Sequence, residues 1–146
     1  MAENANLIRG LMEAFNKRDF DHIREHTAAD SVLIDAGSGE TWRGPDGVIK
    51  YNTMWTDAFP DGKVTIDHIV EAGDRVVVEY TGHGRQTAPL VSERGTIPAT
   101  GREVTLRFCD VYEVENGKVK SLNTYGDSGA LMAQLGLTAG QPAAAE

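Results

Sequence analysis

The sequence predicts an α+β fold, a cone-shaped barrel in which three helices pack on a strongly curved antiparallel sheet and enclose a cavity. Residues 5–59 carry apolar side chains mostly at the three- and four-residue spacing of amphipathic helices. Residues 63–125 instead alternate apolar and polar side chains, as strands do. Short turns separate these strands, so sequential strands are expected to pair as neighbours. Helices segregated from an antiparallel sheet are typical of the α+β class.

Three helices are expected in the first part of the chain. Residues 5–16 combine an apolar stripe with a polar opposite face. The second helix is expected at 19–28, with Asp19 as its N-cap. The third opens at Gly44-Pro45, because proline fits the first helical position, and it ends at Pro60-Asp61-Gly62.

Strands account for most of the remaining chain. They are expected at residues 31–35, 63–72, 75–85, 102–115 and 119–125. Residues 86–100 contain two prolines and are interpreted as a long flap. Asn116-Gly117 predicts a tight hairpin between the last two strands. Residues 128–135 are expected to form a short closing helix, with Gly136 behind it.

Length and charge limit the organisation and the partners. The 146 residues predict one domain over residues 1–137, followed by an Ala-rich polar tail at 138–146 that is expected to be disordered. The net charge of −8 disfavours binding to nucleic acid or to an anionic membrane. No apolar stretch of signal-peptide length occurs near the N-terminus, so a cytoplasmic location is expected. Cys109 is the only cysteine, which excludes an intrachain disulfide and a cysteine-based zinc site.

Several short segments, taken in order, resemble one family. The segment Ile97-Pro98-Ala99-Thr100-Gly101-Arg102, just before a predicted strand, is the most specific of them. The others are Phe15-Asn16-Lys17-Arg18-Asp19, Phe59-Pro60-Asp61-Gly62, Gly73-Asp74-Arg75-Val76, Glu115-Asn116-Gly117-Lys118-Val119, and Asp127 with Gln134-Leu135-Gly136. Together they resemble the SnoaL-like polyketide cyclase family, within the larger group that includes nuclear transport factor 2 and ketosteroid isomerase. The resemblance covers residues 7–137 and implies a cone-shaped α+β barrel, usually a dimer, with acid–base chemistry and no cofactor.

Asp110 is the most informative position in the pattern itself. It lies in mid-strand, on the same predicted face as Phe108 and Tyr112. Burial of a carboxylate is unfavourable without a partner, and it would raise the pKa of Asp110 towards the range useful for general acid or base catalysis. The alternative is a structural aspartate that is hydrogen-bonded to a neighbouring strand or to Tyr112. The resemblance to ketosteroid isomerase implies a carboxylic acid at a similar position that helps to hold an oxyanion.

Asp127 ends the last predicted strand. It matches the aspartate that serves as base in SnoaL-like cyclases, where it removes a proton from the carbon beside a carbonyl and the resulting enolate closes a ring. The alternative is a helix N-cap, for which Asp127 and Ser128 are both suited. Relatives often carry tryptophan four residues earlier, where this chain has Asn123, and this departure weakens the expectation of an aromatic substrate platform.

Asp35 closes the strand at 31–35. Its position resembles that of the general base of ketosteroid isomerase, and it is equally suited to start the Gly-rich turn that follows. The tyrosine that relatives of that isomerase carry on their first helix is replaced by Leu11 here, so steroid isomerisation is disfavoured.

Aromatic and histidine side chains complete the candidate site. Tyr51 and Trp55 recur at helical spacing and are either core residues or an apolar wall for a flat substrate. His83 stands at a strand end and is either exposed or at the mouth of the cavity. The candidate substrate-binding residues are Asp35, Tyr51, Trp55, His83, Phe108, Tyr112 and Asn123.

The other histidines are interpreted as structural. His68 shares a predicted face with Ile66 and Val70, so a core or interface histidine is expected. His22 and His26 have the spacing of metal ligands on a helix, but the residues between them do not match the zinc-protease pattern. No metal site is therefore expected.

These observations favour a cofactor-free enzyme of the lyase or isomerase type that acts on a small, largely apolar carbonyl compound through enolate or aldol chemistry. Asp127 would be the base, and Asp110 with Tyr112 would hold the oxyanion or return the proton. One alternative is a non-catalytic domain that binds a small molecule. Another is epoxide hydrolysis, which needs an inward arginine, whereas Arg107 falls on the face opposite Asp110. The expected partners are a small molecule in the cavity and a second copy of the chain, bound through the outer face of the sheet.

Overall fold

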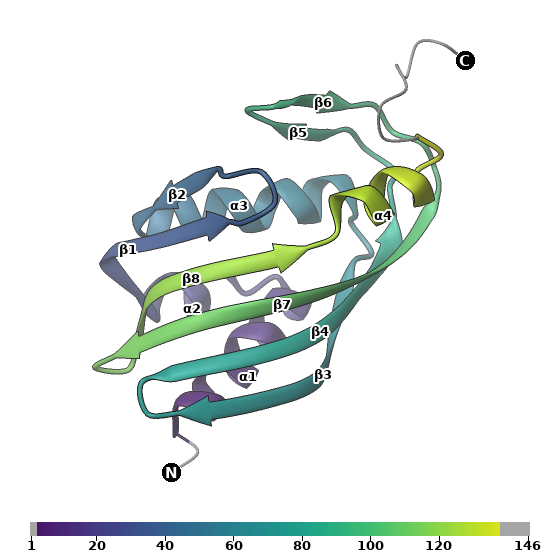
Figure 1. The fold of residues 1–146 in the computed structure, drawn as a ribbon. Coiled ribbons are helices and arrows are strands. Elements are labelled where there is room, and N and C mark those ends of the chain that lie inside the picture. Colours follow the sequence, from purple (N-terminus) through teal and green to yellow (C-terminus); the bar gives the residue numbers. More distant parts are fainter. Residues whose placement is uncertain (1–2, 138–146) are drawn as a thin grey trace.

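The α+β class predicted from the sequence is confirmed. The computed structural model of the protein describes residues 3–137, so the tail at 138–146, expected to be disordered, lies outside the described residues. Within residues 3–137, four helices and eight strands follow one another in the order α1, α2, β1, β2, α3, β3 to β8 and α4 (Figure 1).

The helices begin and end close to the residues that the sequence marks. They are α1 (Glu3–Lys17), α2 (Phe20–Glu25), α3 (Gly44–Ala58) and α4 (Ser128–Gln134). Asp19 caps α2, because its side chain accepts a hydrogen bond from the amide of His22. Helix α2 is shorter than predicted, since β1 already begins at Thr27.

No helix among residues 3–137 combines the length and the apolar character that crossing a membrane requires.

Six strands form one large sheet in the order β2-β1-β8-β7-β4-β3. They are β1 (Thr27–Asp35), β2 (Thr41–Arg43), β3 (Lys63–Ala72), β4 (Arg75–Arg85), β7 (Glu103–Glu115) and β8 (Lys118–Gly126). The sheet is mixed rather than antiparallel, because β1 runs parallel to β8, with Asp35 beside Thr124. The short strand β2, which the sequence did not predict, and β3 stand at the two edges, so the sheet does not close into a barrel.

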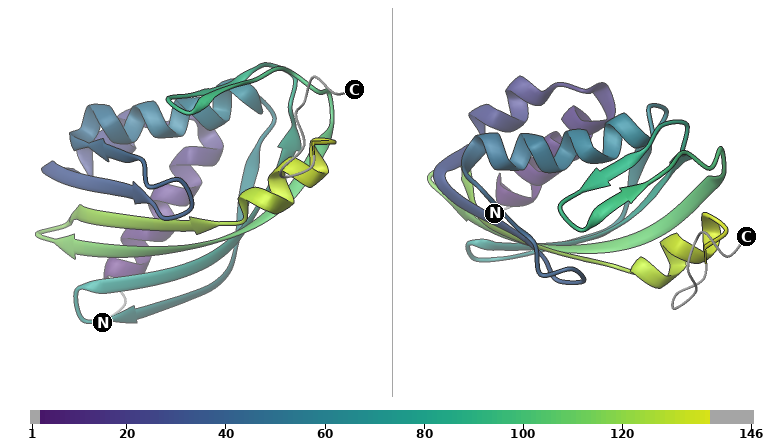
Figure 2. Two further views of the ribbon diagram at one scale, coloured as in Figure 1. Left: turned by 45° about the horizontal axis from the view of Figure 1, so that its top comes forward. Right: turned by 90° about the horizontal axis from the view of Figure 1, so that it is seen from above.

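The sheet curves around helices α1, α2 and α3, which lie on its concave side (Figure 2). Helix α1 packs against β3 and β4, and α3 packs against β1. Four side chains of this interface are almost completely buried, namely Ile8, Leu33, Val76 and Val78. Removal of such apolar surface from water is the main force that holds the two layers together. Helix α4 continues from β8 at the far end of the sheet (Figure 1).

Strand β7 has the predicted inner face. Its buried or half-buried inward residues are Val104, Leu106, Phe108, Asp110, Tyr112 and Val114. Thr105 and Arg107 are exposed on the other side. The alternation expected of a half-buried strand therefore holds along its whole length.

Strand β3 departs from the predicted alternation. Its register against β4 shifts between Ile66 and His68, which marks a β-bulge. Ile66 packs against the core, but after the bulge Ile69 takes the inward position, and His68 and Val70 are exposed. The prediction that His68 shares an inward face with Ile66 is therefore wrong. Its Nδ1 atom lies 3.2 Å from Oε1 of Glu79 on the exposed surface.

The flap at 86–100 contains a hairpin of two short strands, β5 (Leu90–Ser92) and β6 (Gly95–Ile97). Gln86 is fully buried, and its side chain anchors this hairpin through hydrogen bonds. Its Oε1 atom accepts hydrogen bonds from the amide and the hydroxyl of Thr100, at 3.1 and 2.8 Å. Its Nε2 atom donates to the carbonyl of Ile97 at 3.2 Å. One buried amide side chain thus fixes the returning arm of the flap.

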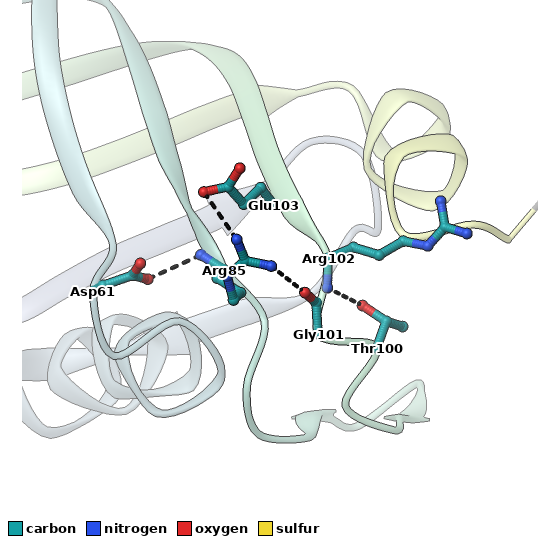
Figure 3. A network of polar contacts seen from close by, with 6 residues as sticks. All are labelled: Asp61, Arg85, Thr100, Gly101, Arg102 and Glu103. Carbon is teal, nitrogen blue, oxygen red and sulfur yellow. Dashed lines mark hydrogen bonds and ion pairs between the residues drawn. The ribbon is translucent and has the colours of Figure 1, made fainter.

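A polar network holds the residues on either side of the hairpin (Figure 3). The guanidinium of Arg85 donates to the carbonyl of Gly101 at 2.6 Å. The side chain of Arg102 runs towards α4 and lies against Gly136, where an added Cβ would stand only 2.8 Å from the guanidinium carbon. The segment at 97–102 therefore links the hairpin, β4 and the end of the closing helix.

Replacement of Gln86 tests this anchor. Gln86→Ala is expected to lower the free energy of unfolding by about 2–4 kcal/mol, because it leaves a cavity and an unpaired Thr100 amide. Urea unfolding measures the loss, and amide hydrogen exchange should accelerate first within residues 87–100. Glu93→Ala at the exposed tip of the hairpin is the control. Equal stability of the two variants would contradict the role of Gln86.

Candidate functional site

A cavity lies between the helices and the concave face of the sheet. It encloses about 1130 Å³ of space, part of it open to solvent. Apolar and aromatic side chains from α1, α2, α3 and strands β1, β3, β4, β7 and β8 make most of its lining. Few polar groups converge on it, which is the usual composition of a small-molecule site. We refer to this space as the main cavity.

The Asp110 carboxyl lies on the wall of the main cavity and is only 3% exposed. Two phenols donate hydrogen bonds to it. The hydroxyl of Tyr80 lies 3.1 Å from Oδ2 and 3.3 Å from Oδ1, and the hydroxyl of Tyr112 lies 3.2 Å from Oδ2. Both the burial expected for Asp110 and its hydrogen bond with Tyr112 are therefore present. This geometry agrees with both the structural and the catalytic interpretation of Asp110.

Burial raises the pKa of Asp110 to about 6. Interactions with Thr124, Tyr80 and Tyr112 lower this pKa, but by less than burial raises it, and the charge of Asp35 adds a further increase. The carboxyl therefore changes its protonation state close to neutral pH, and a catalytic group is most effective when its pKa lies near the working pH.

The phenols around Asp110 remain protonated. Burial raises the pKa of Tyr51, Tyr80 and Tyr112 above the ordinary value, and the negative charge of Asp110 raises all three further. Tyr80 and Tyr112 direct their protons to the carboxyl. The Tyr51 hydroxyl also lies close enough to Asp110 for its pKa to respond to that charge, so it is a neutral hydrogen-bond donor in the main cavity.

Asp35, Thr124 and Asp110 share one row across three neighbouring strands. Asp35 is in register with Thr124, and Thr124 is in register with Asp110. The Thr124 side chain is buried, and its hydroxyl completes no hydrogen bond of good geometry within the described residues. The row explains why the charge of Asp35 reaches Asp110.

An aromatic wall limits the main cavity on one side. Phe108 stacks on Tyr80, with ring centroids 5.2 Å apart, and meets Trp55 edge to face at 6.1 Å. Phe108 fits because its neighbour on β8 is Gly126, where an added Cβ would lie 2.9 Å from the ring. We define the aromatic wall as Tyr51, Trp55 and Phe108, which line spaces on both of its sides.

A second pocket lies on the other side of the aromatic wall. It encloses about 340 Å³, part of it open to solvent. Asp35, Thr124, Asp127 and Ser128 contribute its polar lining. The structure therefore divides the acidic residues of the candidate site: Asp110 lines the main cavity, whereas the other two carboxylates line the second pocket.

Asp127 is the N-cap of α4. Its Oδ1 atom accepts a hydrogen bond from the amide of Ala130 at 2.9 Å, and the residue is exposed. This is the capping geometry that the sequence offered as the alternative to catalysis. Asp35 likewise caps the turn after β1, since its Oδ1 accepts from the amide of Gly37 at 2.9 Å.

The side chains of two other candidate residues point away from the interior. Asn123 is in register with Ile34 and Val111 on the outer face of the sheet and lines neither space, so its position does not support contact with a ligand there. His83 borders the main cavity and is exposed, and the alternation of β4 directs its side chain outwards, between the inward positions Gly82 and Gly84.

Sequence reasoning missed Tyr80, Thr124 and Ser31. Tyr80 follows the buried residues Val76 and Val78 at a two-residue spacing, and this pattern could have placed it on the inner face. Ser31 lines the main cavity with a buried hydroxyl that has no partner among the described residues. No sequence signal separates these hydroxyls from ordinary strand residues, because their significance depends on pairing between distant segments.

Arg107 lies where the sequence placed it, on the face opposite Asp110. It is exposed, and its guanidinium lies 3.9 Å from Oδ2 of Asp67. Among residues 3–137, no arginine lines the main cavity. The inward arginine that the epoxide hydrolysis alternative needs is therefore not found among the described residues that line the main cavity.

The raised pKa of Asp110 predicts a pH dependence of stability. The folded state holds this proton up to about pH 6 and the unfolded chain releases it near pH 4, so the free energy of unfolding falls as the pH rises between these values. The contribution of Asp110 is expected to decrease by about 3 kcal/mol over this range. Asp110→Asn should remove this decrease, because asparagine cannot titrate and still accepts the tyrosine hydrogen bonds.

Chemical denaturation of both proteins at about pH 4 and about pH 7 measures this effect as a double difference. Other carboxylates titrate equally in the two proteins and cancel. An identical pH dependence in the wild type and in Asp110→Asn would mean that Asp110 keeps its ordinary pKa.

Comparison with known proteins places the chain in a family. A model of the SnoaL-like domain matches residues 8–122. No curated protein matches the chain. Among solved structures, a candidate SnoaL-like polyketide cyclase from Jannaschia sp. CCS1 is 21% identical, with a TM-score of 0.82, over 97% of this chain and 94% of that chain.

Two further structures are similar. IdmH from Streptomyces antibioticus, a candidate polyketide cyclase, is 28% identical, with a TM-score of 0.75, over 92% of this chain and 99% of that chain. An LEH-like epoxide hydrolase from M. tuberculosis is 20% identical, with a TM-score of 0.71, over 92% of this chain and 90% of that chain. The resemblance read from the short segments is confirmed, and the chain belongs to the SnoaL-like domain family.

Proposed function

We propose that the protein is a cofactor-free acid–base enzyme that acts on a small, largely apolar carbonyl compound in the main cavity. The observation that carries the proposal is the buried Asp110 carboxyl, which has a pKa of about 6 and lies on the wall of an otherwise apolar space. The similarity to candidate polyketide cyclases supports chemistry of the cyclase or isomerase type.

We assign the proton transfer to Asp110 rather than to Asp127. Asp127 is exposed and lines the second pocket, whereas Asp110 is buried in the main cavity. At neutral pH most Asp110 carboxyls are ionised, and they are more basic than an ordinary carboxylate because burial disfavours the charge. Tyr80 and Tyr112 hold the carboxyl in place by their hydrogen bonds.

The reaction begins when Asp110 removes a proton from the carbon beside the carbonyl. The carbon–hydrogen bond breaks, and its electron pair forms an enolate whose charge rests on oxygen. The neutral Tyr51 phenol can donate a hydrogen bond to that oxygen and so stabilise the developing charge. In a cyclisation, the enolate carbon then attacks a second carbonyl of the same molecule, the π electrons of that carbonyl move to its oxygen, and the alkoxide takes the proton from Asp110. In an isomerisation, a double bond conjugated with the enolate carries the electron pair to a more distant carbon, and that carbon takes the proton from Asp110. The apolar lining limits competing protonation by water.

A non-catalytic binding domain is the second candidate. It is supported by the same hydrogen bonds, because two tyrosines already satisfy the Asp110 carboxyl in the absence of any ligand. Epoxide hydrolysis has support from the similarity to an epoxide hydrolase, but the described lining of the main cavity offers no arginine for it.

Exchange of an acidic carbon-bound proton tests the catalytic proposal without knowledge of the natural substrate. 2-Tetralone is a flat, apolar ketone, and its deuterium uptake from heavy water is followed by proton NMR. We expect the wild type to accelerate exchange over buffer, and Asp110→Asn to lose at least about 100-fold of that acceleration. Tyr51→Phe is expected to lose about 10-fold, because it removes only one hydrogen bond to the enolate.

Asp57→Asn is the control, since it removes one exposed carboxylate from α3. Saturable binding of the ketone without accelerated exchange would favour the binding domain. Equal exchange by Asp110→Asn and the wild type would overturn the assignment of the base. Entry of solvent oxygen-18 into the diol formed from an aromatic epoxide would instead favour the hydrolase.

We further propose that two copies of the chain associate through the outer face of the sheet. An apolar row crosses that face in register, formed by Ile34, Val111, Val77 and Val70, with Asn123 between the first two. Of these, Ile34 is 38%, Val77 37% and Val70 60% exposed. Isologous contact between two such rows would remove this apolar surface from water.

Light scattering after size exclusion tests this association. The wild type is expected at twice the chain mass of 15.8 kDa, and Val77→Lys is expected at the monomer mass because it places a charge within the row, between Val111 and Val70. Val91→Lys is the matched control, since Val91 is 59% exposed but lies on the β5–β6 hairpin. A wild type that elutes as a monomer would contradict the proposal.

A further inference from the structure

The second pocket has a polar composition that the proposed reaction does not use. Its lining combines two carboxylates, Asp35 and Asp127, with a buried hydroxyl from Thr124 and the aromatic wall. Each of the two carboxylates is held by local hydrogen bonds to only one of its oxygens. Asp35 uses Oδ1 for the amides of Gly37 and Ser38, and Asp127 uses Oδ1 for the amide of Ala130.

The remaining oxygen of each carboxylate has no partner in the described part of the chain. No lysine, arginine or histidine there forms an ion pair with Asp35 or Asp127. Two fixed negative charges thus face one pocket without compensation, in a chain whose net charge is already −8. Such a pocket attracts positive charge.

The Thr124 hydroxyl is an independent sign of a missing partner. The residue is 3% exposed and lines the second pocket, and its Oγ1 atom completes no hydrogen bond of good geometry within residues 3–137, although the hydroxyl lies near enough to Asp110 to lower the pKa of that carboxyl. Buried polar atoms are almost always hydrogen-bonded, so this oxygen is an open acceptor for a donor that enters the pocket. It stands in the row between Asp35 and Asp110.

The aromatic wall determines what kind of cation fits. Trp55, Tyr51 and Phe108 present aromatic carbon to the pocket, and Leu131 adds an aliphatic side chain. Aromatic faces attract cations, and they favour organic cations that carry alkyl groups over strongly hydrated metal ions. The pocket is partly open to solvent, so a branched alkyl group can contact the aromatic wall while part of the ligand stays outside.

We propose that the second pocket binds the alkylammonium group of a small organic ligand. The carboxylates of Asp35 and Asp127 supply the charge, the Thr124 hydroxyl accepts an N–H hydrogen bond, and the aromatic wall contacts the alkyl groups. The site is separate from the proton transfer at Asp110, although the two spaces share the aromatic wall. Cation binding is measured without turnover, so failure of this proposal and failure of the catalytic proposal are distinguishable.

Three probes of similar size separate charge, hydrogen bonding and apolar contact. They are tert-butylammonium, tetramethylammonium and tert-butanol, titrated at constant ionic strength into the full-length protein. Amide shifts of residues 35–37 and 124–128, with the indole NH of Trp55, report binding by NMR. We expect saturable binding of tert-butylammonium that is about 10-fold tighter than that of tert-butanol, with tetramethylammonium between them.

Variants then test each contact. The double variant Asp35→Asn/Asp127→Asn is expected to bind tert-butylammonium about 10-fold more weakly than the wild type does. Asparagine also serves in N-caps and Asx turns, so both local structures are retained. Thr124→Val is expected to weaken the binding of tert-butylammonium but to leave the affinity for tetramethylammonium unchanged, because tetramethylammonium has no N–H group. Trp55→Leu should weaken the binding of both cations.

Asp57→Asn with Asp46→Asn is the charge-matched control on α3, outside both spaces. Equal affinity for tert-butylammonium and tert-butanol would overturn the proposal, since the pocket would then be merely apolar. Equal weakening by the control pair would also overturn it, because the attraction would then come from the net charge of the chain. Shifts that spread over the surface without saturation would have the same meaning.

Discussion

The Asp110 carboxyl is buried in the middle of the sheet with no positive charge beside it among the described residues, and the surrounding structure compensates for this with hydrogen bonds. Tyr80 from β4 and Tyr112 from β7 donate to it, so two strands must keep their register for the charge to be tolerated. The same burial makes the carboxyl a stronger base than a surface aspartate. Fold stability and chemical reactivity therefore oppose each other at one residue, as is common at functional sites.

Phe108 determines how the interior is divided. The ring stacks on Tyr80 and occupies the space that Gly126 leaves open on the neighbouring strand. It thereby closes one side of the main cavity and forms one side of the second pocket. The row of Asp35, Thr124 and Asp110 couples the two regions electrostatically, since the charge of one carboxylate raises the pKa of the other.

The sequence predicted what depends on local patterns. The alternation of β7 placed Asp110, Phe108 and Tyr112 on the inner face, and the residue types at Asp19 and Asp127 allowed their capping roles to be recognised. It could not predict the parallel pairing of β1 with β8, because that contact joins segments at opposite ends of the chain. The separation of Asp127 from Asp110 was hidden for the same reason. Asp110 and Asp127 are close in the sequence, but they line different spaces. The aromatic wall, to which α3 contributes Tyr51 and Trp55, borders both spaces.

The bulge in β3 has a consequence for the evolution of this surface. One extra residue near Asp67 reverses which side chains of the strand point inwards, so Ile69 packs on the core and Val70 joins the outer face. Loss of that residue in a relative would restore simple alternation and exchange the two faces over the last part of the strand. An alignment drawn through β3 without a gap would then equate cavity-facing residues of one protein with outward-facing residues of the other. Substitution patterns in this strand are comparable only among relatives that share the bulge.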